Sequence, residues 1–183
     1  MKTVKVSAPS STANLGPGFD VFGLALDAFF DQITLTKKNS GVSIITSDNI
    51  PINVNQNTAG IVVKAMQKKF KIKSGVELKI KKGVPAGFGM GSSAASAAAA
   101  ALAFNKLFNL KLDNKTLVKF AGMGEKGSAG TIHYDNVAAS LLGGFVVVKT
   151  KPFDVIRLDP PKDLVLCVAI PKIKVPAKKT KMS

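Results

Sequence analysis

Alternating apolar and polar side chains predict a series of short strands along the chain. The first covers Thr3 to Ala8, with Val4 and Val6 on one face, and a turn is expected where Pro9 and a Ser-Ser-Thr cluster follow. The most regular alternation is found at 76–82, which predicts a half-buried strand. The further predicted strands are 32–36, 42–46, 145–150 and 164–170.

Helical periodicity and a capping residue predict two helices in the first two thirds of the chain. Asn57 is the expected N-cap of a helix whose apolar stripe includes Ile61 and Ala65. Residues 92–107 are rich in alanine and have the highest helix propensity in the chain. Their small side chains allow close approach to a neighbouring element, so this helix is expected to be buried.

Two more helices are predicted on either side of a glycine-rich stretch. Asp113 can cap a helix at 115–123, and the glycines of 122–130 are expected to interrupt regular structure. A short helix at 133–142 then ends at Gly143 and Gly144. Strands interleaved with helices from end to end indicate a two-layer α+β or α/β domain.

Length and composition are those of an ordinary globular chain. The 183 residues are 46% hydrophobic and 20% charged, which predicts one domain over 1–170 and a lysine-rich tail, 171–183, that frays. A single cysteine and a single histidine exclude an intramolecular disulfide and the usual zinc site. No apolar run has the length of a membrane span, and residues 1–17 lack the apolar core of a signal peptide, so a cytoplasmic protein is expected.

The charge balance suggests an anionic partner. Lysine and arginine number 26 against 11 aspartates and glutamates, a net charge of +15, and Arg157 is the single arginine. The lysines are spread along the chain, which is also typical of a solvated basic surface. Nucleic acid and nucleotide phosphate both remain open on this ground.

One segment predicts a phosphate site directly. A strand ends, three alternating glycines follow, and the alanine-rich helix begins at two serines. Glycines at positive φ let the backbone approach a ligand, while the free amides and the dipole of a helix N-terminus favour an anion. The segment consists of Val84, Pro85, Ala86, Gly87, Phe88, Gly89, Met90, Gly91, Ser92, Ser93 and Ala94. It is neither a Walker loop, which requires a following lysine, nor a dinucleotide fingerprint.

Three motifs resemble the GHMP small-molecule kinases. The phosphate segment resembles their P-x-x-x-G-L-G-S-S-A motif, with Met90 in place of the usual leucine. Residues 7–26, SAPSSTANLGPGFDVFGLAL, resemble the amino-terminal signature of the homoserine kinases within that family, and 133–145, HYDNVAASLLGGF, resemble a second homoserine kinase segment. The resemblance implies a two-layer amino-terminal GHMP domain with a ribosomal-protein-like βαβ fold, which uses ATP and Mg²⁺ to phosphorylate the hydroxyl of L-homoserine in threonine biosynthesis.

The resemblance also implies roles for individual residues. Asn14, Asp20 and His133 would bind homoserine, and Asn136 would lie close to the reacting hydroxyl. Glu125, which stands among glycines, has the chemistry of a Mg²⁺ ligand, and the Ser93 hydroxyl can reach a phosphate-bound Mg²⁺. Catalytic roles are therefore expected for Asn136 and Glu125, metal binding for Ser93 and Glu125, and a place at the edge of the adenine pocket for Asn57.

The match weakens after residue 170. The family pattern V-P-T-K-x-A-R is represented by Val175-Pro176-Ala177-Lys178-Lys179-Thr180-Lys181, so alanine replaces the threonine and Lys181 replaces the arginine expected to bind the substrate carboxylate. The carboxy-terminal GHMP domain is expected to be missing. A face that such a domain would have covered predicts dimerisation or poor solubility.

Two alternatives remain from the sequence. A non-catalytic, basic RNA-binding module is suggested by the net charge of +15, but the chain has one tyrosine and no tryptophan for base stacking. An inactive half-domain of a kinase would also carry these motifs. Nucleic acid is therefore the less favoured partner, and homoserine and nucleotide are the favoured ones.

Overall fold

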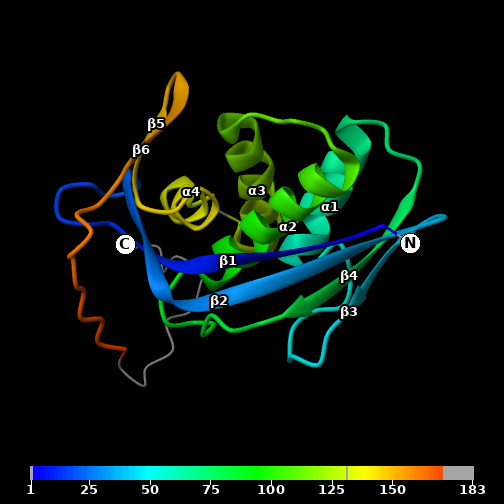
Figure 1. Cartoon of the computed structure of the whole chain (residues 1–183), viewed down its shortest axis with the longest axis horizontal. Helices are drawn as coiled ribbons and strands as arrows, with labels where there is room; N and C mark the ends of the chain where they lie inside the picture. Colours follow the sequence, from blue (N-terminus) through cyan, green and yellow to red (C-terminus); the bar gives the residue numbers. More distant parts are fainter. Residues whose placement is uncertain (1, 131, 171–183) are drawn as a thin grey trace, which may run out of the picture.

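A mixed sheet and a layer of helices on one of its faces make up the computed structural model, which describes residues 2–130 and 132–170 (Figure 1). The strands are β1 (Thr3–Ala13), β2 (Phe22–Lys38), β3 (Val42–Ile45), β4 (Gly75–Lys81), β5 (Phe145–Thr150) and β6 (Phe153–Leu158). The helices are α1 (Thr58–Lys69), α2 (Ser92–Phe108), α3 (Asn114–Ala129) and α4 (Tyr134–Leu142). The two-layer α+β architecture expected from the sequence is confirmed.

The long strand β2 organises the sheet. It pairs with antiparallel β1 along one edge, and along the other edge with β4 near its end and with β5 near its start. β3 lies parallel to β4, so β3, α1 and β4 form a βαβ unit, and β6 completes the far side against β5. Between β4 and β5, the amide of Ala25 on β2 donates to the carbonyl oxygen of Gly144, just before β5.

The alanine-rich helix α2 lies at the centre of the core. Its alanines from Ala94 to Ala101 are fully buried, and the helix packs against β1, β2 and the three other helices of the described chain. Methyl side chains allow this close approach on several sides, so the predicted buried helix is confirmed. Asn57 and Asp113 also act as the N-caps expected, accepting hydrogen bonds from the amides of Gly60 and Thr116.

The expected turn at Pro9 is wrong. Strand β1 continues through it to Ala13, and the pairing with β2 shifts register between Pro9 and Ser10. The residues left unpaired at this shift, 27–29, belong to β2, so β1 itself continues as a strand through Pro9. Ser10 and Ser11, which follow Pro9, are both fully buried.

The expected break in the glycine-rich stretch 122–130 is also wrong, because α3 runs on to Ala129. Here the glycines serve packing. A side chain at Gly124 would collide with the carbonyl oxygen of Thr58 and with Val62, and one at Gly127 would collide with Ile61. Close contact with α1 offsets the helix-breaking tendency of glycine, and the helix ends at Gly130 in the left-handed conformation.

The chain end differs from the prediction in one strand. Leu164–Ile170 forms no strand, whereas the unpredicted β6 pairs with β5. All of 164–170 is exposed, although the segment is apolar. Residues 171–183, expected to fray, lie outside the described residues. No helix within 2–130 and 132–170 combines the length and apolar character that crossing a membrane requires.

Candidate active site

The predicted phosphate segment forms a loop between β4 and α2. Gly87, Gly89 and Gly91 adopt φ values of 83°, 72° and 66°, as the sequence analysis expected of glycines in such a loop. Gly91 is the N-cap of α2 and provides no side-chain hydrogen bond to the helix. The amides of the first turn are consequently not capped by that residue, which leaves the positive end of α2 suited to an anion.

A small apolar cluster of its own anchors this loop. Val84 and Met90 are buried together with Leu26 of β2 and Ala95 of α2. The carbonyl oxygen of Met90 also accepts a hydrogen bond of 3.1 Å from the amide of Ser11. Methionine therefore fills the position where the family motif has leucine, and the loop is fixed on both sides of its glycines.

The two serines at the start of α2 interact with different partners, and neither of these contacts caps the helix. Ser92 donates its hydroxyl to the carbonyl oxygen of Val84 at 2.9 Å, which joins the two ends of the loop. The Ser93 hydroxyl lies close enough to the carboxylate of Glu125 on α3 to lower the pKa of that carboxyl. The structure thus places together the two residues expected to bind a metal.

Glu125 connects the phosphate loop to the segment before α4. The side chain is 2% exposed, and besides the Ser93 hydroxyl the backbone of His133 lies close enough to lower the pKa of its carboxyl. Burial raises the pKa of Glu125, while the Ser93 hydroxyl and the charge of His133 lower it again in part. Glu125 follows Gly122 and Gly124, so α3 must stay helical through these glycines to place the carboxylate beside the phosphate loop. The expected break would have misplaced it.

The loop after β1 brings Asp20 towards His133. Asn14 and Asp20 adopt left-handed φ values of 60° and 55°, and the side-chain oxygen of Asn14 accepts a hydrogen bond from the amide of Asp20 at 3.0 Å. Asp20 Oδ1 lies 3.9 Å from His133 Nδ1, with half of the Asp20 side chain exposed. Asn14, Asp20 and His133, the residues expected to bind the substrate, therefore lie close together at the surface. Asn14 also stabilises the loop after β1 through its hydrogen bond to Asp20.

A chain of two serine hydroxyls fixes the side-chain oxygen of Asn136. Ser11 donates to Asn136 Oδ1 at 3.0 Å, and Ser140 donates to the Ser11 hydroxyl at 3.1 Å. A Cβ atom at Gly91 would lie 3.2 Å from Asn136 Oδ1, so Asn136 adjoins the last glycine of the phosphate loop. Neighbouring Asp135 is buried, accepts the amide of Asn136, and has its pKa raised by desolvation.

Four segments that are distant in the sequence thus meet: the loop after β1, the phosphate loop, the end of α3 and the start of α4. Sequence reasoning missed Ser11, Ser140, Asp31 and Lys82, which support this region. A signal for Asp31 existed, because a carboxylate inside an apolar strand must have a partner. For Ser11, the expected turn at Pro9 concealed its inward position.

The expected roles of two further residues stay predictions. The side chain of Asn57 accepts the amide of Gly60 and donates to the carbonyl oxygen of Pro51, so its amide is used in capping and a place beside adenine stays a prediction. Lys181, like Ala177, lies outside the described residues.

The donor set fits magnesium. Mg²⁺ is bound by oxygen ligands, commonly one or two carboxylates together with substrate phosphates and water. Glu125 and Ser93 offer a carboxylate and a hydroxyl at the positive end of α2. No cluster of three or more histidine, cysteine or acidic side chains suited to a metal occurs in the described part of the chain. A metal here would therefore depend on ligand phosphates, as Mg²⁺ does.

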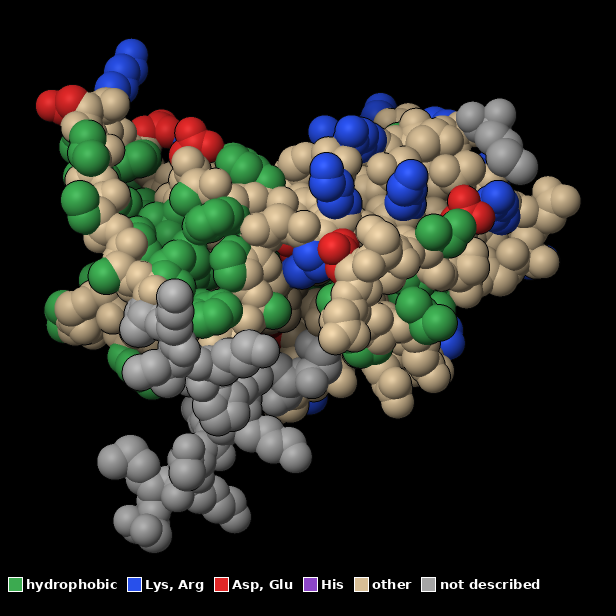
Figure 2. Space-filling model, turned by 90° about the horizontal axis from the view of Figure 1, so that it is seen from below, with side chains coloured by type: hydrophobic (Ala, Val, Ile, Leu, Met, Phe, Trp, Pro, Cys, Tyr) green, Lys and Arg blue, Asp and Glu red, His purple; other side chains and the backbone are tan. Residues whose placement is uncertain are grey.

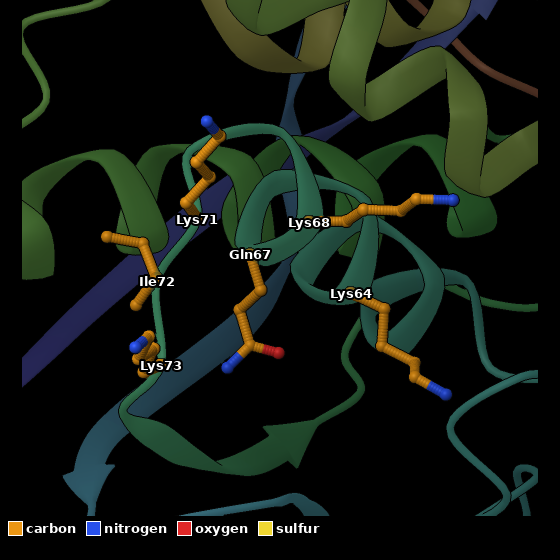
Figure 3. A pocket seen from close by; sticks show the side chains of 6 residues that line it. All are labelled: Lys64, Gln67, Lys68, Lys71, Ile72 and Lys73. Atoms are coloured by element: carbon orange, nitrogen blue, oxygen red, sulfur yellow. The ribbon is translucent and has the colours of Figure 1, made fainter.

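A hollow of about 550 Å³ lies at the end of α1, away from the proposed site (Figure 3). It is lined by Lys64, Gln67, Lys68, Lys71, Ile72 and Lys73. Figure 3 shows its amines pointing in different directions, so they do not converge on one ligand. This lysine-lined hollow contains none of the predicted site residues.

The aromatic side chains give little support to RNA binding. Phe22 and Phe145, Phe70 and Phe120, and Phe104 and Phe108 form ring pairs. Rings packed against one another are not platforms for bases.

Known proteins with similar sequences belong to one family. A model of the GHMP kinases N terminal domain matches residues 57–144. A homoserine kinase of Methanococcus maripaludis is 45% identical over 97% of this chain and 60% of its own length. One of Methanopyrus kandleri is 49% identical over 87% of this chain and 52% of its own length. The chain thus spans between half and two thirds of the length of these curated relatives.

Solved structures show the same similarity. The crystal structure of a homoserine kinase from Cytophaga hutchinsonii superposes with a TM-score of 0.80 at 38% identity, covering 88% of this chain and 53% of that one. A mevalonate kinase of Methanococcus jannaschii gives a TM-score of 0.68 at 16% identity, over 86% of this chain and 56% of its own, which shows a shared fold.

Proposed function

Since the chain belongs to the GHMP kinase family, we propose that it is the amino-terminal part of an ATP-dependent kinase that phosphorylates the hydroxyl of L-homoserine. The observation that carries this proposal is the position of Glu125, whose buried carboxylate lies close to both Ser93 at the phosphate loop and the backbone of His133. One carboxylate thereby links the place for phosphates to the place for an amino acid.

The phosphate loop would hold the nucleotide. Its three glycines and the uncapped N-terminus of α2 present backbone amides, which bind phosphate oxygens without an arginine or a Walker lysine. Ser93 and Glu125 would hold Mg²⁺, which neutralises the phosphate charge that develops during transfer. Positioning and charge stabilisation account for most of the catalysis in such transfers.

The other side of the site would bind the amino acid. The carboxylate of Asp20 suits the ammonium group of homoserine, and His133, 3.9 Å from it, offers a second polar contact. Asn136 lies beside Gly91, so its amide can orient the hydroxyl towards the phosphates. No general base is assigned, since dissociative phosphoryl transfer requires little proton abstraction before bond breaking. Lys181 would supply a charge for the substrate carboxylate.

The exposed apolar surface supports the dimerisation expected from the sequence. Ile156 and Leu158 of β6 and Val165 are more than half exposed, and apolar side chains gather over one end of the molecule in Figure 2. Such a face is seldom left in water. We keep dimerisation as a proposal, to be tested by sedimentation of the purified chain at several concentrations.

Product formation tests the function directly. The chain is incubated with ATP, Mg²⁺ and L-homoserine, and phosphorus NMR follows the appearance of O-phosphohomoserine. L-Serine, which is one methylene shorter, and mevalonate serve as competing acceptors. Product from homoserine alone supports the proposal. Nucleotide binding without any transfer would indicate an inactive half-domain, and equal transfer to mevalonate would contradict the substrate assignment.

A further inference from the structure

A buried carboxylate outside the proposed substrate site joins both ends of the phosphate loop. Asp31 lies on β2 and is fully buried. Its Oδ1 atom accepts the amides of Gly83 and Val84, each at 3.0 Å, where the chain leaves β4 and begins the loop. Its Oδ2 atom accepts the hydroxyl of Ser96 at 2.6 Å, in the first turns of α2, and the ammonium of Lys82.

Lys82 completes the same connection from the other direction. Besides Asp31, its ammonium donates to the carbonyl oxygen of Ser92 and to the hydroxyl of Ser96, both at 2.9 Å. Its backbone amide donates to Asp48 at 2.8 Å. An ammonium has three hydrogens to donate, and here all three have protein acceptors.

This arrangement excludes the role that a lysine beside a phosphate loop would suggest. A lysine that binds phosphate must direct its ammonium at the ligand, as the Walker lysine does. The ammonium of Lys82 is directed at Asp31, Ser92 and Ser96, and the ion pair with Asp31 adds no net charge. The anion affinity of the loop therefore comes from backbone amides, whose directions depend on how the two ends of the loop are held.

We propose that Asp31 is a positioning residue for nucleotide binding, because with Lys82 it fixes 83–84 at the start of the loop against 92–96 at its end. The inference rests on the proposed function in that the loop is taken to bind nucleotide phosphates. Four hydrogen bonds to one carboxylate set the separation of the loop ends. The glycine amides between them are thereby held in directions suited to phosphate before the ligand arrives, which lowers the entropy lost on binding.

Amide hydrogen exchange tests the positioning without any ligand. In Asp31→Asn the amide nitrogen meets the donors Lys82 and Ser96, so exchange at 83–84 and 92–96 is expected to accelerate about tenfold or more. If this variant does not fold, Asp31→Asn combined with Lys82→Met removes both charges at similar volume. Glu77→Gln is the matched control, since Glu77 also pairs across β2 and β4, with Lys38 at 3.2 Å, but at the surface. Unchanged exchange in the Asp31 variants overturns the proposal.

Calorimetric titration with MgADP and with L-homoserine separates positioning from general destabilisation. At a temperature where every variant is folded, loss of the Asp31 carboxylate is expected to weaken MgADP binding about tenfold and to leave homoserine binding unchanged. Faster exchange with undiminished MgADP affinity overturns the proposal, as does an equal loss for both ligands. If the unaltered chain binds no MgADP, the proposed function fails instead, and the exchange experiment still decides whether Asp31 fixes the loop.

Discussion

Ser11 and Asn136 are 125 residues apart in the chain, and Ser11 donates a hydrogen bond of 3.0 Å to the side-chain oxygen of Asn136. Ser140 on α4 donates in turn to the Ser11 hydroxyl on β1. The hydrogen bonds therefore run in one direction, from Ser140 to Ser11 to Asn136. An asparagine whose oxygen is occupied presents its amide hydrogens on the other side. In the proposed kinase, those hydrogens would face the reacting hydroxyl.

Replacing Ser11 with alanine is therefore expected to reduce kcat about tenfold, with little change in KM, because Asn136 can then turn its amide. Steady-state transfer from ATP to homoserine measures both constants. Ser10→Ala is the control, since Ser10 is equally buried but donates to the carbonyl oxygen of Leu26. Both variants lose a buried hydrogen bond, so equal losses of kcat would show that Ser11 acts only through stability.

The last glycine of the phosphate loop is expected to be the least tolerant of substitution. Gly91 has a φ of 66°, and a Cβ atom there would collide with the hydroxyl of Ser11. Gly91→Val is expected to abolish MgADP binding, as measured by calorimetric titration. Gly89→Ala is the comparison, because Gly89 has a φ of 72° but a Cβ atom there would meet nothing within 4 Å. Positive φ strains both variants, so similar losses would mean that strain and not the collision is decisive.

Removing the carboxylate of Glu125 is expected to abolish the contribution of Mg²⁺ to the affinity for ADP. In Glu125→Gln, the affinity for ADP with Mg²⁺ should fall to that measured with a chelator, because a neutral amide is a poor ligand for a hard cation. Titrations of ADP with Mg²⁺ and with EDTA measure the difference. Glu77→Gln, at the surface, should retain the full effect of Mg²⁺. A persistent effect in Glu125→Gln would assign the metal to other residues.

Replacing Asp20 is expected to weaken the binding of homoserine and not that of MgADP. Asp20→Asn removes the charge proposed to bind the substrate ammonium but keeps the backbone hydrogen bond to Asn14. Homoserine binding should weaken about tenfold or more, since a charge-assisted hydrogen bond is lost, and MgADP binding should stay within about twofold. Separate titrations with each ligand provide the comparison. A parallel loss of both affinities would contradict the proposed place of the substrate.

Stability should depend on pH through Glu125. Burial raises the pKa of this carboxyl in the folded chain above the ordinary value of 4.5. The folded state then binds more protons than the unfolded state, so this contribution to stability is complete below 4.5 and is lost as pH rises through the raised pKa. Urea unfolding of the ligand-free chain and of Glu125→Gln across this range should show the free energy of unfolding falling more steeply in the unaltered chain. Parallel curves would contradict the raised pKa.

Local features of the sequence determined much of the fold. The sequence predicts Asn57 and Asp113 as N-caps, the alanine-rich helix, and a loop of glycines before that helix. The structure confirms these elements, each of which depends on neighbours within a few residues. The resemblance to the GHMP kinases likewise rests on short, continuous motifs. Such motifs specify local backbone conformations, which form with little help from distant parts of the chain.

The tertiary structure alone decided the rest. Pro9 lies inside a strand, and the glycines of α3 remain helical, because pairing with β2 and contact with α1 outweigh local preference. The same holds for the bonds that Ser11 makes to Asn136 and that Asp31 makes to Lys82. These partners are far apart in sequence and lack a local signal for one another, since a buried polar group requires a partner but does not specify which one; the packing of the core made that choice.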